Sequence, residues 1–429
     1  MNILMMTNTF TPHVGGVARS VEAFTAEFRR RGHRVLVVAP EFENMPQDAV
    51  DVIRIPAIQR FNGSDFSVVL PVPGFLRSAI ERFRPDIVHS HHPFLVGGTA
   101  LRLAHVYQRP FVFTHHTMYE QYTHYVPGDS KALKRFVVNL STSYANLCDC
   151  VFAPSESVAA ILRERGVEAP IEVVPTGVRL ARFTGGSGAG FRAAAQIPPD
   201  AFVVGHVGRL APEKNLGFLA EAVAAFAAAE PRAHFLVVGG GPSHGAIRET
   251  FARHGVDGRL HLMGVLDQIL LISAYCAMDV FAFASKTETQ GMVLTEAMAA
   301  GVPVVALDAP GAREVVGDGR NGRLLRIESV ADFVAALRWI ATLPKPRRAR
   351  LERGARTTAE AFSLERSADK ALAVYERLRR QSFVARQEAY NLWRAARRLI
   401  GAEWDLLKGM TRAAGAAPGA GRPEGRSSP

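Results

Sequence analysis

Cysteine is scarce in this chain of 429 residues, which contains only Cys148, Cys150 and Cys276. An odd number of cysteines gives no complete disulfide framework, and their spacing forms neither a CxxC pair nor a zinc site. The sequence also lacks an HExxH motif, so we expect no bound metal, although several histidines follow predicted strands. The reducing cytoplasm is the simplest compartment for such a chain.

Long apolar runs are missing as well, since no stretch approaches the roughly 18 residues that a membrane-spanning helix needs. The opening segment MNILMMTNTF is typical of a buried strand rather than of a signal peptide. Net positive charge is nearly absent before residue 345: residues 345–429 hold 19 Lys and Arg against 9 Asp and Glu, which accounts for 10 of the 11 net charges. This distribution argues against a nucleic-acid-binding core and predicts that the basic end contacts an anionic surface.

Short apolar runs alternate with amphipathic segments through most of the chain, as in α/β proteins. Their Val, Ile and Leu content predicts parallel strands that are buried on both faces. In the first half a helix is predicted over Arg19–Arg31, closed by Gly32, and the predicted strands are Asn2–Met6, Val35–Ala39, Val52–Ile55, Ile87–Ser90, Phe111–His115, Val151–Ala153 and Ile171–Val174. In the second half helical segments run from Val330 to Arg380, and the predicted strands are Val203–Val207, Phe235–Val238, Leu260–Met263, Val280–Ala284, Val304–Leu307 and Gly322–Leu325.

The pattern predicts two doubly wound, Rossmann-like domains, residues 1–180 and 181–380, with a ligand cleft at the carboxyl ends of their strands. The sequence does not decide whether the last helix of the second domain packs back on the first domain. The stretch Thr184–Asp200, rich in Gly, Ala and Pro, is predicted to be a linker. Residues 381–429 are predicted to form a basic amphipathic helix followed by a disordered, low-complexity tail.

The segment Ser285–Ala306, SKTETQGMVLTEAMAAGVPVVA, carries the strongest functional signal. It follows a predicted strand and opens a helix, whose first backbone N–H groups form a natural phosphate site, here at Gly291, Met292 and Val293. Glu288 lies in the loop and Glu296 on the second turn of the helix. Two carboxylates so placed can hold different hydroxyl groups of one extended ligand.

The Glu-x7-Glu pattern followed by AMAAGVPVVA resembles the signature of the retaining glycosyltransferase family 4, whose members have the GT-B fold. The resemblance implies that Glu288 binds the transferred sugar and that Glu296 binds the ribose of a nucleotide diphosphate sugar. It further implies that no cofactor is required. The expected donor is a UDP-sugar, with GDP-mannose as the alternative.

The segment Gly205–Asn215, GHVGRLAPEKN, supplies Arg209 and Lys214, which match the Arg and Lys of the family's phosphate-binding loop. Fixed cations in a water-poor cleft stabilise a departing diphosphate, and loss of one such donor can raise the barrier by roughly 3–4 kcal/mol. The chain has no Asp-x-Asp motif, with which the other large glycosyltransferase fold holds a metal. Arg209 and Lys214 are therefore expected to take the role of that metal.

Further loops match the family at single positions. The Gly15–Gly16 pair follows the first strand, where paired glycines let the backbone approach the donor phosphates and the sugar. Main chain near Val265 is expected to pair with the base. In THHTMYE, His116 matches the family's cleft histidine and is expected to contact the donor sugar, but the doubled histidine leaves the register against His115 open. Gly239–Gly241 is interpreted either as a ligand contact or as simple turn geometry.

The segment His115–Pro127, HHTMYEQYTHYVP, together with TETQG, resembles bacterial diacylglycerol glycosyltransferases, which make membrane glycolipids. The expected acceptor is a membrane lipid such as diacylglycerol. Tyr119, Tyr122 and Tyr125 recur at a spacing of three, and they either line an acceptor groove or pack in the core. Three alternatives stay open: a glycosyltransferase of lipopolysaccharide or exopolysaccharide synthesis, a sugar-nucleotide epimerase or phosphorylase, and a non-catalytic sugar-nucleotide-binding protein.

Two basic amphipathic segments predict attachment to an anionic membrane surface. The first, Lys131–Leu147, has an apolar face of Leu133, Phe136, Leu140, Tyr144 and Leu147, and basic residues at its start, Lys131, Lys134 and Arg135. The second has an apolar stripe of Trp393, Ala396, Ile400, Trp404 and Leu407 beside Arg394, Arg397 and Arg398. Packing on the protein body is the alternative for both. The sequence therefore predicts a cytoplasmic enzyme on the inner face of the cell membrane, with a nucleotide sugar and a lipid or saccharide acceptor as partners and no nucleic acid.

Overall fold

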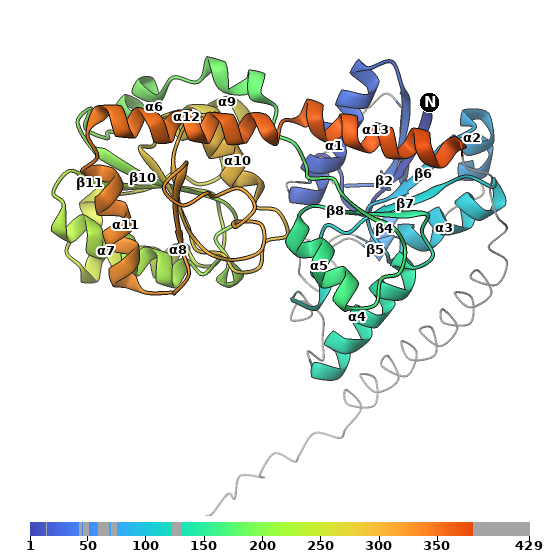
Figure 1. Ribbon diagram of the computed structural model, residues 1–429, viewed down its shortest axis with the longest axis horizontal. Coiled ribbons are helices and arrows are strands. Elements are labelled where there is room, and N and C mark those ends of the chain that lie inside the picture. The colour runs from blue at the N-terminus through green and yellow to red at the C-terminus, as the bar shows by residue number, and fades with distance from the viewer. Residues whose placement is uncertain are drawn as a thin grey trace, which may run out of the picture. The chain divides into compact units, whose positions relative to one another are not determined.

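Two parallel β-sheets covered by helices make up the part of the chain that the computed structural model describes, which is residues 1–13, 15–42, 45, 51–58, 68–69, 75–121 and 130–380 (Figure 1). One sheet has seven strands in the order β3-β2-β1-β6-β7-β8-β9, and the other has six in the order β12-β11-β10-β13-β14-β15. Every strand pair within the two sheets is parallel. The prediction of two Rossmann-like sheets is confirmed.

The first sheet has β1 at its centre, where Ile3 lies opposite Val35 of β2 and Ile87 of β6. Its strands are β1 (Asn2–Met6), β2 (Arg34–Pro40), β3 (Val52–Ile55), β6 (Ile87–Ser90), β7 (Phe111–Thr114), β8 (Cys150–Ala153) and β9 (Ile171–Val173). A separate antiparallel pair joins β4 (Ala57–Ile58) and β5 (Val68–Val69). The helices of this half are α1 (Gly16–Arg30), α2 (Phe75–Phe83), α3 (Val96–Val106), α4 (Lys131–Ala145) and α5 (Glu156–Glu164).

The second sheet is built in the same way from a later part of the chain. Its strands are β10 (Phe202–Val207), β11 (Ala233–Val238), β12 (Leu260–Leu262), β13 (Val280–Phe283), β14 (Val304–Leu307) and β15 (Gly322–Leu325). Its helices are α6 (Gly188–Ala194), α7 (Leu216–Ala229), α8 (His244–Arg253), α9 (Gln268–Cys276), α10 (Met292–Ala299), α11 (Val330–Ala341) and α12 (Lys345–Ala361).

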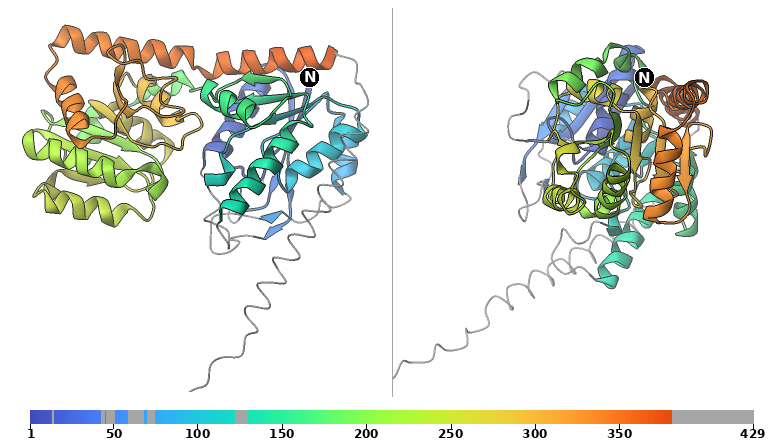
Figure 2. Two further views of the ribbon diagram at one scale, coloured as in Figure 1. Left: turned by 60° about the horizontal axis from the view of Figure 1, so that its bottom comes forward. Right: turned by 90° about the vertical axis from the view of Figure 1, so that its left-hand side faces the viewer.

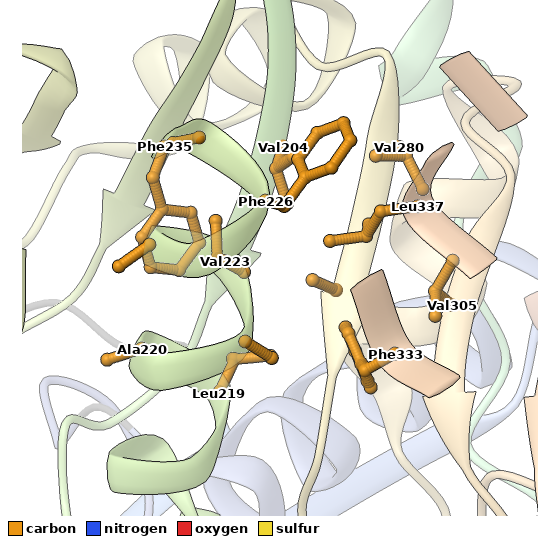
Figure 3. Packing of buried hydrophobic residues seen from close by; sticks show 14 of the residues in the cluster. Val204, Leu219, Ala220, Val223, Phe226, Phe235, Val280, Val305, Phe333 and Leu337 are labelled. Atoms are coloured by element: carbon orange, nitrogen blue, oxygen red, sulfur yellow. The ribbon is translucent and has the colours of Figure 1, made fainter. Parts of the chain in front are cut away.

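Successive side chains of β10 point to opposite faces of the second sheet and so enter two different cores. Val204 packs with Phe226 of α7 and Leu337 of α11 on one face (Figure 3). Val203 belongs to the core on the other face, which helices α9, α10 and α12 cover. Both faces are therefore buried, which explains why the central strands β13 and β14 are apolar along their whole length.

The chain crosses between the two sheets twice within the described residues. The first crossing follows β9, and the second joins α12 to α13 (Leu364–Arg380), which packs with α1 against the first sheet (Figures 1 and 2). The two crossings are hydrogen-bonded to each other: Val178 N donates to Phe362 O and Leu364 N donates to Val178 O, both at 2.9 Å. Gly177 lies so close to this bridge that a Cβ atom there would be 2.2 Å from Leu364 Cα.

The prediction that Thr184–Asp200 is a linker is wrong, because most of this segment is folded against the second sheet. It contains α6, whose N-cap Ser187 accepts a hydrogen bond from Gly190 N at 3.2 Å. Phe191 is buried, and a Cβ atom at Gly188 would be 2.2 Å from Cys276 O. The small residues here allow close packing on α9 rather than flexibility.

Two further predictions concern the start of the first helix and the lack of a membrane-spanning helix. Helix α1 begins at Gly16, three residues before the predicted start at Arg19. Among the described residues, no helix is both long enough and apolar enough to cross a membrane.

Candidate functional site

Four of the loops that carry predicted donor residues follow the carboxyl ends of neighbouring strands in the second sheet. Strands β12, β11, β10 and β13 are adjacent in that order. The loops after them contain, respectively, Val265, Gly239–Gly241, the Arg209–Lys214 segment and Glu288. Since parallel strands end at one edge of a sheet, this topology brings the four loops to the same edge, where α/β sheets bind ligands.

Lys214 and Glu288 form an ion pair with each other across two of these loops. Their side chains are 18% and 19% exposed, so the pair is partly shielded from water. The loops are also joined by Thr287, whose hydroxyl donates to Glu213 O at 3.2 Å. Arg209 in turn pairs with the carboxylate of Glu213. Both cations and the sugar-binding carboxylate named by the family resemblance therefore lie together, each cation facing an acid.

The Gly239–Gly241 loop supports the loop that carries Arg209. Leu210 N donates to Gly240 O at 2.8 Å, and a Cβ atom at Gly239 would be only 1.9 Å from Gly208 O. Gly239 also has a φ of +136°, which L-residues with side chains rarely adopt. A Cβ atom at Gly241 would likewise lie 2.4 Å from Leu210 O, so backbone packing accounts for Gly239 and Gly241 without a ligand.

Helix α10 begins directly after the loop that holds Glu288. Its N-cap Gly291 has a left-handed backbone with φ +68°, and a Cβ atom there would be 2.9 Å from Leu294 Cδ1. Met292 and Val293 form the first turn, where backbone N–H groups have no acceptor within the helix. The predicted phosphate-binding residues therefore lie at a real helix N-terminus at the carboxyl edge of the sheet.

Glu296 lies on α10 and is held by two side chains from other elements. The hydroxyl of Tyr275 donates to Glu296 Oε2 at 2.7 Å, and Arg19 Nη1 lies 3.8 Å from Glu296 Oε1. Burial raises the pKa of Glu296, and the positive charge of Arg19 opposes this rise. Sequence reasoning missed Arg19, although its position one turn after the Gly15–Gly16 pair offered a signal.

The Gly15–Gly16 pair forms the entry to α1, with Gly15 as the N-cap. A Cβ atom at Gly16 would meet no atom within 4 Å, so packing does not require glycine there. Val265, whose main chain is expected to pair with the base, is 73% exposed. The neighbouring Gly264 O accepts a hydrogen bond from Gly239 N at 2.7 Å.

Histidines gather at the carboxyl ends of β6 and β7 in the first sheet. His116 is partly exposed, its ring Nε2 lies 2.9 Å from Nδ1 of His91, and its carbonyl oxygen accepts a hydrogen bond from Thr289 Oγ1 at 2.8 Å. His115 is buried, and neither of its ring nitrogens has a hydrogen-bond partner among the described residues. Of the two registers, His116 is therefore the one with an accessible ring. Tyr119 is partly buried in contact with His115, whereas Tyr122 and Tyr125 lie outside the described residues.

The buried histidines make stability depend on pH. Burial lowers the pKa of His89 and of His92 to about 3, whereas an unfolded histidine titrates near 6.5. Between these values only the unfolded chain binds the protons, so stability is full above pH 6.5 and falls as the pH falls. From about pH 7.5 to about pH 5.5, these two residues are expected to lower the free energy of unfolding by about 3 kcal/mol, measured by urea denaturation.

The control for this prediction is His92→Asn. His92 Nδ1 accepts a hydrogen bond from Asn8 N at 3.1 Å, and an asparagine oxygen can occupy that acceptor position without titrating. The variant should lose about 1.4 kcal/mol of the pH dependence. An unfolding free energy that is constant over this pH range would contradict the assignment.

No group of three His, Cys, Asp or Glu side chains is arranged as metal ligands within the described residues.

Comparison with protein families assigns both halves of the chain. Residues 14–182 match the model for Glycosyltransferase Family 4, and residues 201–342 match Glycosyl transferases group 1. The alpha-monoglucosyldiacylglycerol synthase of Acholeplasma laidlawii is 30% identical over 342 residues, which cover 75% of this chain and 84% of that protein. The chain belongs to glycosyltransferase family 4.

Other relatives of this glycosyltransferase differ in donor and acceptor. An alpha-monoglucosyldiacylglycerol synthase of Streptococcus pneumoniae is 27% identical over 337 residues, covering 76% of this chain and 75% of the relative. A GDP-mannose-dependent alpha-mannosyltransferase of Mycobacterium tuberculosis is 29% identical over 343 residues, covering 76% and 84%. The solved structure of Anabaena HepE in complex with UDP matches with a TM-score of 0.69 and 20% identity, covering 88% of this chain and all of that one. The glycosyltransferase therefore has the GT-B fold.

Gln290, in the loop between β13 and α10, has a structural role. Its buried amide binds the backbone of Thr176 twice, accepting from Thr176 N at 2.7 Å and donating to Thr176 O at 2.5 Å. The hydroxyl of Thr176 is 2.7 Å from that of Ser20 on α1. Gln290 thereby joins the loop that holds Glu288 to the first crossing.

Gln290→Leu is expected to lower the free energy of unfolding by about 2–4 kcal/mol, because it leaves the buried N–H and C=O groups of Thr176 unpaired. Urea denaturation measures this loss. The matched control is Gln268→Leu at the exposed start of α9, which should change stability by less than about 0.5 kcal/mol. Equal stability of the two variants would refute the structural role.

Proposed function

We propose that this glycosyltransferase transfers a hexose, with retention of configuration, from a UDP-sugar to diacylglycerol in a membrane. The observation that carries the donor half is the joint arrangement of Arg209, Lys214 and Glu288 at the carboxyl edge of the second sheet. The acceptor half is supported by the two diacylglycerol glycosyltransferase relatives and by the exposed basic helix described below.

In this proposal the donor replaces contacts that the chain makes with itself. The diphosphate binds Arg209, Lys214 and the N–H groups at the start of α10, and no metal or other cofactor is required. Lys214 exchanges its partner Glu288 for a phosphate oxygen, which leaves the carboxylate of Glu288 to accept hydrogen bonds from sugar hydroxyls. Lys214 thus has an anionic partner both before and after the donor binds.

The remaining donor contacts follow the geometry of the site. His116 binds the sugar, Glu296 binds the ribose and main chain near Val265 pairs with the base. The Gly15–Gly16 backbone approaches the phosphates from the first sheet, where Gly16 leaves open space. Transfer proceeds by attack of the acceptor hydroxyl on the face that the leaving diphosphate occupied, so a diphosphate oxygen takes the proton and the configuration is retained.

Helix α4 supports contact with an anionic membrane. Its second half is packed, since Tyr144 is fully buried, but near its start Phe136 is 40% exposed and lies beside exposed Lys134 and Arg135. Basic residues around an exposed aromatic side chain are typical of a helix that lies on an anionic bilayer, which agrees with an enzyme on the inner face of the cell membrane. The second predicted membrane helix, around Trp393, lies outside the described residues.

The full-length protein is expected to bind vesicles that contain anionic lipid at low salt and to release them at high salt. Replacing Lys134 and Arg135 by glutamate should weaken binding about 30-fold or more, at about 1 kcal/mol for each lost charge. Sedimentation with vesicles measures the effect, with neutral vesicles and a variant at exposed Arg77 of α2, Arg77→Glu, as controls. Binding that ignores both salt and these substitutions would remove α4 from the proposal.

The decisive experiment follows radioactive label from a panel of UDP- and GDP-sugars into organic-extractable lipid, with and without diacylglycerol micelles. Diacylglycerol-dependent label from a UDP-hexose, absent in Glu288→Ala, is the expected result. Label from GDP-mannose alone would favour the mannosyltransferase relatives as the guide to the donor. Donor turnover without lipid label would move the acceptor to a saccharide and overturn the glycolipid assignment.

A further inference from the structure

His91 and His116 form a pair at the carboxyl edge of the first sheet, and only one of the two rings is accessible. His91 is 1% exposed and its backbone is fixed, because His91 N donates to Met6 O at 2.9 Å. Its ring stacks on those of His89 and His116 at centroid distances of 4.2 and 5.2 Å. His116 is partly exposed and its carbonyl is held by Thr289.

One hydrogen bond joins the rings, between His91 Nδ1 and His116 Nε2 at 2.9 Å. Burial lowers the pKa of both rings well below 6.5, so each ring is neutral and carries one proton. A neutral imidazole donates from one nitrogen and accepts at the other, and the hydrogen bond at one nitrogen fixes the role of the second. Only two arrangements of the pair are therefore possible.

The two arrangements differ at the other nitrogen of His91. His91 Nε2 is buried and has no hydrogen-bond partner among the described residues. If His116 were the donor, His91 Nε2 would carry a buried N–H without an acceptor, and orphaned buried N–H groups are rarer than orphaned acceptors. If His91 Nδ1–H is the donor, the unpaired atom is only an acceptor.

We infer that His91 is a positioning residue, which donates from Nδ1 to His116 Nε2 and so fixes His116 as the tautomer with a proton on Nδ1. Nδ1 of His116 has no hydrogen-bond partner in the described part of the chain. His116 then offers a hydrogen-bond donor, aimed at a hydroxyl oxygen of the donor sugar. The inference rests on the proposed function only for that sugar contact, and the tautomer itself is a property of the free enzyme.

Histidine-selective ¹⁵N labelling of the full-length protein tests the tautomer without any substrate. The His116 signals, assigned by their loss in His116→Gln, are expected to show Nδ1 protonated and Nε2 unprotonated in the wild type. His91→Leu should abolish this preference, while His91→Asn should keep it because its amide can supply an N–H at the place of Nδ1. A wild-type His116 protonated on Nε2, or a His116 spectrum unchanged by His91→Leu, would overturn the inference.

Kinetics with the donor then separate this inference from the proposed function. His91→Leu is expected to lower kcat/KM for the donor about tenfold, as loss of a correctly placed hydrogen bond does, and His91→Asn should restore most of it. Tyr375→Phe is the matched control: it removes the hydroxyl that lies 2.5 Å from His89 Nδ1 in the same cluster and should leave the His116 tautomer unchanged. A tautomer that changes in His91→Leu without any change in kcat/KM would uphold the positioning role and refute the sugar contact of His116.

Discussion

Lys214→Ala should reduce kcat for sugar transfer about 100- to 1000-fold, because it removes a fixed positive charge from the departing diphosphate. The loss should appear in kcat more than in the free energy of unfolding, since the Lys214–Glu288 pair is partly exposed and contributes little to stability. Initial rates of donor turnover and urea denaturation of the same preparations measure the two effects.

Lys286 provides the control for this substitution. It lies in the same loop as Glu288, but its side chain is 56% exposed and pairs with Glu328 instead. Lys286→Ala should retain transfer within about threefold of the wild type, as expected for an exposed ion pair. Equal rates in Lys214→Ala and in the wild type would refute the role of Lys214 in stabilising the leaving group.

Gly239→Ala should abolish donor binding and destabilise the fold, because the new Cβ atom would lie 1.9 Å from Gly208 O at a φ of +136°. The backbone next to Arg209 would have to move, and strain of this kind costs about 1–3 kcal/mol before the clash is counted. Calorimetric titration with UDP and thermal unfolding measure the two losses.

Substitutions at two nearby glycines, Gly245 and Gly240, distinguish a packing role of the loop from direct contact with the ligand. A Cβ atom at Gly245 would meet no atom within 4 Å, so Gly245→Ala should preserve both stability and UDP binding. At Gly240 the nearest atom would be Val265 Cγ2 at an ordinary 3.5 Å. If Gly240→Ala lost UDP binding while Gly239→Ala kept it, the loop would contact the ligand directly, contrary to the packing interpretation.

The sheets were predictable from sequence because strands buried on both faces are apolar along their whole length, as β13 and β14 are. The same strands predicted that Arg209 and Glu288 each lie in a loop after a strand, which are β10 and β13. The failure at α6 has a physical cause: glycine and alanine are enriched both in linkers and where backbones pack closely, and composition does not distinguish the two.

The side-chain contacts between the loops and helices of the site could not be predicted from the sequence, because they join residues far apart in the chain. Lys214 and Glu288 were each predicted to bind the donor, but their pairing across 74 positions depends on how two loops fold. Gln290 and Thr176 are separated by 114 positions, and nothing in either segment names the other. Arg19 reaches Glu296 only because α1 and α10 approach one another.

The two crossings also determine how this enzyme can move. Within the described residues the chain itself passes between the sheets only near Val178 and Ser363, and these segments are bonded side by side as a parallel bridge. Two adjacent connections act as a hinge with one preferred axis, whereas widely separated ones would clamp the halves. Gln290 binds Thr176, two residues from Val178, so a rotation about this axis would be carried to the loop that holds Glu288.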